Sequence, residues 1–199
     1  MYKLGLTGSI ATGKSTVLAQ FAALGHETFS ADAAVHELYE SPASAPIAAA
    51  FPQAVRNNRI DRRALSALLI SSPLRMQELN DIVHPLVHTI ILDFMERATK
   101  KGARLIIVDI PLLFESNHTY EFDGVALTWC SPEVQKQRAL ARPDMNVEKF
   151  NFILAHQMSQ SEKKQRADFL INTNGTLEET QEQVARIADL CLARSKKPN

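Results

Sequence analysis

The chain of 199 residues lacks a net charge, because its 22 basic side chains are matched by 22 acidic ones. Proteins that bind nucleic acids or anionic membranes by general attraction carry a basic excess. The balance therefore argues against both classes, and any basic residues important for function should act locally.

Cysteines and long apolar runs are also scarce. Cys130 and Cys191 lie far apart, and we expect two ordinary thiols rather than a disulfide or a metal site. The best apolar run, Leu105 to Phe114, is interrupted by Asp109 and is too short to cross a bilayer. No apolar targeting segment precedes the first strand-like run, so we expect a soluble, cytoplasmic protein. The sequence contains no repeats and no low-complexity tracts.

The most informative motif lies near the N-terminus. Residues 8–15 fit the pattern G-x-x-x-x-G-K-[ST] and follow the strand-like run Tyr2 to Thr7. In such a loop the backbone N–H groups turn toward a phosphate, Lys14 reaches the β- and γ-oxygens, and the Ser15 hydroxyl ligates Mg²⁺. A helix predicted from Lys14 to about Leu24 would add its positive end to the same anion. A chance glycine turn is the alternative, but the order of strand, loop and helix favours a nucleoside triphosphate site. We expect ATP contacts from Gly8, Ala11, Thr12, Gly13, Lys14, Ser15 and Thr16.

Strand-like runs alternate with helical patterns, which predicts an α/β fold with parallel strands joined by right-handed crossovers. Strands are predicted at Tyr2–Thr7, Glu27–Ser30, Arg104–Ile110, Gly124–Cys130 and Phe169–Asn172. The last helix should run from about Thr176 to Arg194, because Thr176 and Glu179 have the spacing of a capping box.

A block without strand signals, residues 33–101, interrupts this alternation and is predicted to be an inserted helical subdomain. Asp61 can cap one helix, and a longer one should follow Pro73. Pro85 should kink or divide that helix, because proline has no N–H to donate. The block ends at a glycine stop, Lys100-Lys101-Gly102. The nucleotide-binding core is then expected at residues 1–32 and 102–199.

A basic segment in the second half, residues 132–160, is predicted to form a lid. Arg138 and Arg142 should share one face of a helix spanning Pro132 to Arg142, and a hinge at residues 143–146 should lead into a helix from Val147 to Ser159. The two arginines either clamp the triphosphate during transfer or form a solvated helix face. A mobile lid would exclude water, which competes with an acceptor hydroxyl.

Two carboxylates stand where ligands of open α/β sheets bind, just beyond predicted strands. Asp32 could accept the proton of an attacking hydroxyl, or it could be the N-cap of a helix from Ala33 to Tyr39. Asp109 ends an apolar strand and could support Mg²⁺, directly or through water, or it could be a simple capping carboxylate.

Several further short motifs occur in a definite order across nearly the whole chain. They are Gly-Leu-Thr-Gly at 5–8, Asp-Ala at 32–33, His-Pro-Leu-Val at 84–87, Asp-Ile-Pro-Leu-Leu-Phe-Glu at 109–115, Gln157-Met158, Ala167-Asp168 and Asn174-Gly175. In this order and spacing the chain resembles the dephospho-coenzyme A kinase family. The segment Pro-Leu-Leu-Phe-Glu and the upstream His-Pro are the more specific parts.

The resemblance implies a three-layer P-loop kinase core, a helical domain at 33–101 that receives dephospho-CoA, and an arginine-containing lid. It implies transfer of the ATP γ-phosphoryl group, with Mg²⁺, to the 3'-hydroxyl of the dephospho-CoA ribose, which completes coenzyme A. The partners would be ATP and dephospho-CoA, without nucleic acid or membrane, and the protein would be a monomer or a weak homo-oligomer.

The resemblance also implies residue roles. Asp32 would be the base, Lys14 and Ser15 would hold phosphates and Mg²⁺, and Arg138 and Arg142 would neutralise the transferring group. Acceptor contacts would come from Thr7, Asp32, His84, Pro111, Leu112, Leu113, Phe114 and Glu115. Asn174 and Gly175 would lie near the adenine.

The chain departs from the family pattern at four positions. Ser9 and Ala11 replace common glycines, Ile153 stands where a lid arginine is usual, and Asn172 replaces an aspartate. The substitutions in the loop should alter its flexibility rather than abolish binding. One lid cation would be missing, and Lys149 or Arg166 are the candidates to replace it.

Three other classes share the phosphate loop. Another small-molecule kinase would differ mainly in the helical insertion. A GTP-dependent switch usually carries Asn-Lys-x-Asp, which does not occur in this sequence. An ATP-driven motor or transporter subunit typically has a glutamate directly after the strand-terminal aspartate, whereas Ile110 follows Asp109 here.

Overall fold

A computed structural model describes residues 1–41, 44–57, 59–70, 72–116 and 120–195. The chain divides into two compact units. We call Met1–Phe29 with Arg97–Asn199 the core unit, and Ser30–Glu96 the inserted unit.

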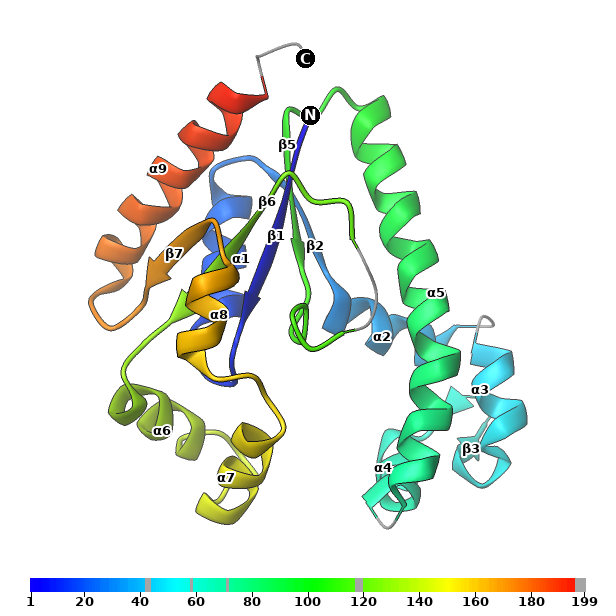
Figure 1. The fold of residues 1–199 in the computed structure, drawn as a ribbon. Coiled ribbons are helices and arrows are strands. Elements are labelled where there is room, and N and C mark those ends of the chain that lie inside the picture. Colours follow the sequence, from blue (N-terminus) through cyan, green and yellow to red (C-terminus); the bar gives the residue numbers. More distant parts are fainter. Residues whose placement is uncertain (42–43, 58, 71, 117–119, 196–199) are drawn as a thin grey trace. The chain divides into compact units, whose positions relative to one another are not determined.

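The core unit is built on a five-stranded sheet in the order β2-β5-β1-β6-β7 (Figure 1). Its strands are β1 (Tyr2–Gly8), β2 (Glu27–Ser30), β5 (Leu105–Asp109), β6 (Gly124–Trp129) and β7 (Phe169–Asn172). Strand β1 pairs in parallel with β5 and with β6, and β6 pairs in parallel with β7. All five predicted strands and the α/β class are confirmed.

Alternate residues of β1, β5 and β7, together with Ala126 of β6, form one hydrophobic cluster with α1 (Lys14–Ala23) and α9 (Leu177–Arg194). Leu4 and Leu6 of β1 are fully buried there with Phe21 of α1 and Cys191 of α9. The alternation follows from the strand period of two, which sends every second side chain to the same face. Burial of a side chain such as Phe21 contributes about 1.5–3 kcal/mol to stability.

Figure 1 shows α1 behind the sheet and α8 (Gln160–Arg166) in front of it, so the strands are covered on both faces. The predicted capping box of α9 is present, because the Thr176 side chain accepts from Glu179 N and the Glu179 side chain accepts from Thr176 N. Both cysteines are free and buried, as expected of ordinary thiols.

The predicted lid segment differs from the expectation at two points. Helix α6 (Pro132–Leu140) ends before Arg142, which therefore lies in the following turn rather than on the helix. Helix α7 (Val147–Ala155) stops four residues before the predicted Ser159, and α8 begins after a break. The physical reason is a second capping box, in which the Ser159 and Glu162 side chains each accept from the other residue's backbone N–H.

The inserted unit contains α2 (Ala31–Glu40), α3 (Ala45–Ala50), a 3₁₀ turn η2 (Pro52–Ala54), strands β3 (Val55–Arg56) and β4 (Arg59–Ile60), α4 (Arg62–Ile70) and most of α5 (Pro73–Lys100). The expectation that this block has no strands is wrong, because β3 and β4 pair antiparallel. Two residues on each side are too few to produce an alternating pattern in the sequence. Asp61 caps α4 as predicted, accepting from Arg63 N and Ala64 N at 2.9 and 3.1 Å.

Pro85 does not divide α5, which runs unbroken from Pro73 to Lys100. The Thr89 hydroxyl donates to Pro85 O at 3.0 Å, within the turn that follows the proline. The predicted glycine stop is confirmed, since Gly102 has φ of 74° and its N–H donates to Thr99 O. Within the described ranges, no helix is both long and apolar enough to cross a membrane.

Candidate active site

The phosphate-binding loop follows β1 and ends at the N-terminus of α1. Gly13 has φ of 85° and precedes α1 directly. A Cβ on Gly8 would collide with the Thr128 and Thr12 hydroxyl oxygens, so glycine is required there by packing. Ala11, at a position where glycine is common in the family, also adopts a left-handed φ of 60°. An L-residue in that conformation costs about 1–2 kcal/mol, which the neighbouring contacts must offset.

Lys14 and Asp109 form an ion pair beside this loop. Lys14 Nζ lies 2.5 Å from Asp109 Oδ1, and the two side chains are 13% and 3% exposed. Asp109 pairs in register with Leu6 of β1, so the ends of β5 and β1 bring the carboxylate next to the loop. The predicted neighbours of the triphosphate are thus together in space.

Three buried threonines connect the loop to the sheet: Thr12 lies in the loop, Thr128 in β6 and Thr173 directly after β7. The Thr12 hydroxyl donates to Ser9 O at 2.8 Å and lies 2.9 Å from the Thr128 hydroxyl. The Thr173 hydroxyl lies 2.9 Å from Thr12 O and 3.2 Å from Trp129 O. These contacts tie the loop to the ends of β6 and β7, and neither Thr128 nor Thr173 was predicted to take part.

Two glutamines hold the backbone of Ile10 in the same loop. Ile10 N donates to Gln157 Oε1 at 3.0 Å, and Gln135 Nε2 donates to Ile10 O at 2.8 Å. Gln160 Nε2 in turn donates to Gln135 Oε1 at 3.0 Å. The predicted lid segment therefore grips the phosphate-binding loop through its side chains.

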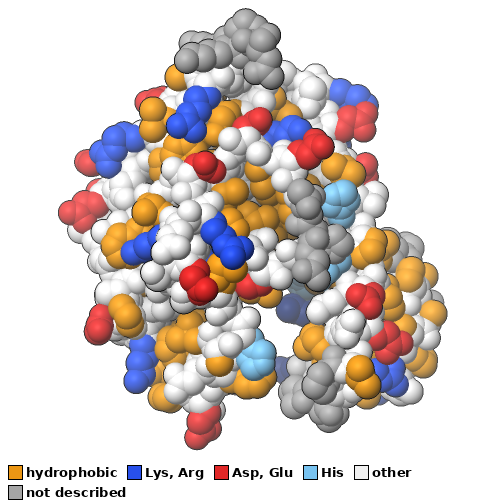
Figure 2. Space-filling model, viewed as in Figure 1, with side chains coloured by type: hydrophobic (Ala, Val, Ile, Leu, Met, Phe, Trp, Pro, Cys, Tyr) orange, Lys and Arg blue, Asp and Glu red, His pale blue; other side chains and the backbone are white. Residues whose placement is uncertain are grey.

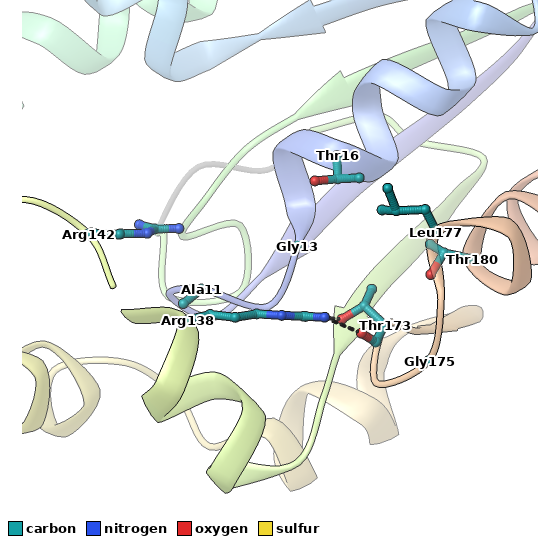
Figure 3. Close-up of a pocket in the computed structure, with 9 residues that line it drawn as sticks. All are labelled: Ala11, Gly13, Thr16, Arg138, Arg142, Thr173, Gly175, Leu177 and Thr180. Carbon is teal, nitrogen blue, oxygen red and sulfur yellow. Dashed lines mark hydrogen bonds between the residues drawn. The ribbon is translucent and has the colours of Figure 1, made fainter. Parts of the chain in front are cut away.

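A cavity of about 280 Å³ opens beside the loop (Figure 3). It is lined by Ala11, Gly13, Thr16, Arg138, Arg142, Thr173, Gly175, Leu177 and Thr180. The lining brings together residues of the loop, the lid and the turn after β7. From the sequence, each of these segments was predicted separately to contact ATP. Asn174 stands next to Gly175, and its Oδ1 accepts from Ser131 N at 2.7 Å.

The two arginines of the cavity differ in how they are held. Arg138 Nη1 donates to the Thr173 hydroxyl at 3.1 Å, and its Nη2 donates to Thr173 O at 2.7 Å, as the dashed lines of Figure 3 mark. Arg142 is exposed and comes from the turn after α6. Beneath them, burial raises the pKa of Cys130, although the Arg138 guanidinium acts in the opposite direction.

The acceptor segment predicted at Pro111–Glu115 follows β5 in the core unit. Pro111 O accepts from the Thr7 hydroxyl at 3.2 Å, Leu112 is 45% exposed and Leu113 is buried. Glu115 Oε1 accepts from Met158 N at 2.9 Å and lies 2.8 Å from the Nζ of fully buried Lys163. The Glu115 carboxylate thus joins the acceptor segment to the base of the lid.

Asp32 and His84 belong to the inserted unit and are both exposed. Asp32 is not the N-cap of α2, because the Ser30 side chain accepts from Ala33 N and holds that position. Asp32 instead lies in the first turn of α2, and the capping interpretation of its carboxylate is wrong.

The residues predicted for Mg²⁺ fit a cation that prefers oxygen. Ser15 supplies an exposed hydroxyl and Asp109 a buried carboxylate near Lys14. Among the residues described, no group of three or more His, Cys, Asp and Glu is arranged for a metal. Mg²⁺ at nucleotide sites takes one or two protein ligands besides phosphates and water, and a hydroxyl and a carboxylate are oxygen donors of the kind it prefers.

The candidates for the missing lid cation lie away from the described lining of the cavity. Lys149 Nζ donates to Asp144 O at 3.2 Å, and Arg166 is exposed in the last turn of α8. Neither contributes to the cavity lining given above, whose basic side chains are Arg138 and Arg142.

Comparisons with known proteins agree with this geometry. A family model described as dephospho-CoA kinase matches residues 2–179. The dephospho-CoA kinase of Rhizobium meliloti is 42% identical over 189 residues, which cover 95% of this chain and 97% of that protein. The one from Bartonella quintana is 43% identical over 187 residues, covering 94% of this chain and 96% of that protein. The crystal structure of TT1252 from Thermus thermophilus is 32% identical, with a TM-score of 0.81 over 95% of this chain and 96% of that chain. Since the family model spans the phosphate-binding loop, the acceptor segment and the arginines of the lid, the chain belongs to the dephospho-CoA kinase family.

Proposed function

We propose that this protein is a dephospho-CoA kinase, which transfers the γ-phosphoryl group of ATP to the 3'-hydroxyl of the dephospho-CoA ribose. The products are coenzyme A and ADP. The observation that carries the proposal is the loop with its Lys14–Asp109 pair and arginine-lined cavity, in a chain of this family.

In the proposed reaction the 3'-oxygen attacks the γ-phosphorus while the bond from that phosphorus to the β–γ bridging oxygen breaks. Asp32 accepts the proton of the attacking hydroxyl. Its exposed carboxylate is available for that role, because Ser30 already caps α2.

Charge on the transferring group is balanced by cations of the core unit. Lys14 would exchange its contact with Asp109 for the β- and γ-oxygens. Arg138, fixed by Thr173, would hold the nucleotide before transfer, and Arg142 would act on the charge that develops during transfer. Ser15 would hold Mg²⁺ and Asp109 would support it through water, and the ion would supply neutralisation of the charge on the β- and γ-phosphates.

The two substrates would be recognised by different sets of residues. Asn174 and Gly175 would lie near the adenine of ATP, at the edge of the cavity beside Gly13. Thr7 and Pro111–Glu115 in the core unit, and His84 in the inserted unit, would contact dephospho-CoA.

We further propose a cytoplasmic protein that acts as a monomer or weak homo-oligomer, without nucleic acid or membrane. On the face visible in Figure 2, basic and acidic side chains are interspersed rather than gathered by sign. A surface of this kind supports small charged substrates bound at a local site rather than a long polyanion.

The test is a coupled ADP-release assay with MgATP, run with dephospho-CoA, without acceptor, and with AMP, GMP or shikimate. We expect ADP release to require dephospho-CoA and to yield a product heavier by one phosphoryl group. Faster release with another acceptor would assign the chain to a different small-molecule kinase. Fast release without any acceptor would instead indicate an ATPase.

A further inference from the structure

The Thr173 hydroxyl is a junction between the lid arginine and the phosphate-binding loop. It accepts from Arg138 Nη1 at 3.1 Å and lies 2.9 Å from Thr12 O (Figure 3 draws its contact with Arg138). Thr173 is 5% exposed, so water is largely excluded from these contacts. Residues that are 161 positions apart in the sequence therefore meet in one buried hydrogen-bonded chain.

The proton of this hydroxyl has a preferred acceptor. A hydroxyl donates one proton at a time, and here Thr12 O and Trp129 O are both within reach, at 2.9 and 3.2 Å. Trp129 O already accepts from Thr173 N at 2.9 Å. We therefore assign the hydroxyl proton to the nearer Thr12 carbonyl, since the Trp129 carbonyl already has a donor in Thr173 N.

The Thr12 carbonyl belongs to the same peptide unit as the Gly13 N–H, which stands at the N-terminus of α1. N–H groups at this position of a phosphate-binding loop point toward the anion. Hydrogen bonds in a chain polarise one another, and a cationic donor at the head of the chain strengthens those that follow. A chain from Arg138 through Thr173 to Thr12 therefore makes Gly13 a better phosphate donor.

We propose that Thr173 is a positioning residue that transmits the charge of Arg138 to the phosphate-binding loop. Arg138 then acts on the phosphates of MgATP through the loop as well as from the cavity. This inference rests on the proposed function, in which the loop holds ATP and Arg138 faces it.

The threonine side chain offers matched substitutions. Thr173→Val keeps the branched shape, including a methyl group on the side where a Cβ on Gly13 would point, but removes the hydroxyl, whereas Thr173→Ser keeps the hydroxyl. The backbone carbonyl that accepts from Arg138 Nη2 remains in both variants. A difference between them therefore reports on the hydroxyl.

We would measure MgATP affinity by calorimetry and turnover with dephospho-CoA for Thr173→Val, Thr173→Ser, Arg138→Ala and the double variant Arg138→Ala/Thr173→Val. Thr173→Val should weaken MgATP binding about tenfold to a hundredfold and lower turnover, since a hydrogen bond to a charged group is lost. Thr173→Ser should stay close to the original protein. In the double variant the valine should add little to the loss caused by Arg138→Ala, because the chain is already broken.

The outcomes separate this inference from the proposed function. If Thr173→Val binds MgATP normally, or if the two losses add in the double variant, the transmitting role is overturned. If Arg138→Ala leaves MgATP affinity and turnover intact, both the transmitting role and the proposed role of Arg138 are overturned, while phosphorylation of dephospho-CoA by the unaltered protein still supports the proposed function. Thermal denaturation checks folding, and Thr173→Ala, which also lacks the hydroxyl, is read by the same criteria if the valine variant does not fold.

Discussion

The core unit and the inserted unit bury different kinds of side chain. Among the described residues, the buried polar side chains of the core unit are Thr7, Ser9, Thr12, Asp109, Thr128, Gln135, Lys163, Thr173 and Thr180, whereas the inserted unit buries Ser44. Many of those in the core unit surround the phosphate-binding loop and hold one another in place. Large apolar side chains are exposed in both units, for example Leu74 in the inserted unit and Phe152 in the core unit.

This contrast shows that the two units hold their candidate functional residues in different ways. A buried polar network is costly unless every group is paired, and when paired it fixes one geometry. The core unit therefore has a preorganised site for phosphates. The inserted unit presents its candidate residues, Asp32 and His84, on its surface, as expected of a part that must meet a substrate held elsewhere.

The largest effect should come from the inserted unit if it supplies the base. Asp32→Asn should lower turnover about a hundredfold to ten-thousandfold, because an amide cannot accept the proton. MgATP affinity, measured by calorimetry, should not change. Glu37→Gln, an exposed neighbour on α2, is the control and should retain full turnover. Normal turnover in Asp32→Asn would remove it as base and would place all the chemistry in the core unit.

In the core unit, Lys14→Ala should lower turnover about a hundredfold to a thousandfold through the lost phosphate contact. It should also destabilise the protein, because the mostly buried ion pair between Lys14 and Asp109 would be lost. Lys14→Ala/Asp109→Asn should recover the melting temperature but not the activity. Lys101→Ala, an exposed ion-pair partner of Glu27, is the control and should change neither. Recovery of activity in the double variant would contradict the role of Lys14.

Arg142→Ala should lower turnover about a hundredfold and affect MgATP affinity less, since we propose that Arg142 acts on charge developing during transfer. Arg138→Ala should lower both turnover and MgATP affinity, because Thr173 holds Arg138 in the cavity before transfer begins. Steady-state rates and calorimetry on both variants test this division. Equal losses of rate and affinity in Arg142→Ala would mean a ground-state contact.

The pH dependence of stability should depend on the core unit, which holds both cysteines. Burial raises the pKa of Cys191 to about 12, from the 9.0 of an exposed thiol. The unfolded chain therefore releases this proton first, so the stabilisation is complete below pH 9 and is lost as the pH rises toward 12. At pH 10 the loss should be about 1 kcal/mol. Urea unfolding between pH 8 and 10 should show a shallower decline in Cys191→Ala, and an unchanged decline would assign the effect to other groups.

The smallest effect is expected at the exposed apolar surface of the inserted unit. Leu74 is 79% exposed, and Leu74→Ser should change the free energy of unfolding by less than about 0.5 kcal/mol. Leu79 lies on the same helix but is only 6% exposed. Leu79→Ala should therefore lower the free energy of unfolding by about 2–5 kcal/mol. Denaturant unfolding of both variants provides the measurement. A large loss in Leu74→Ser would mean that Leu74 packs against something in solution.

Local patterns in the sequence predicted much of the fold. The loop at residues 8–15, the five strands, the Asp61 cap and the capping box at Thr176 each depend on residues close in the chain. The break between α7 and α8 was missed although Ser159 and Glu162 repeat the capping-box spacing, because apolar residues continued the helical pattern before it. The local signal was present but was outweighed.

The contacts that complete the site could not be predicted in this way. Thr173 meets Thr12, and Lys163 meets Glu115, only because the sheet brings distant segments together. A threonine in a strand-rich sequence or a lysine in a basic helix has no local mark of such a role. Gln157 was part of the family pattern, but its contact with Ile10 N required the three-dimensional arrangement.

The reactivity of the Lys163 amine can report how often the contact between the lid and the acceptor segment opens. Its ammonium group is fully buried beside Glu115, while Lys149 on α7 is exposed. An amine-acylating reagent should therefore label Lys149 at once and Lys163 only when this joint opens by local unfolding. The rate at which mass spectrometry finds acylated Lys163 would then measure how often the base of the lid comes apart.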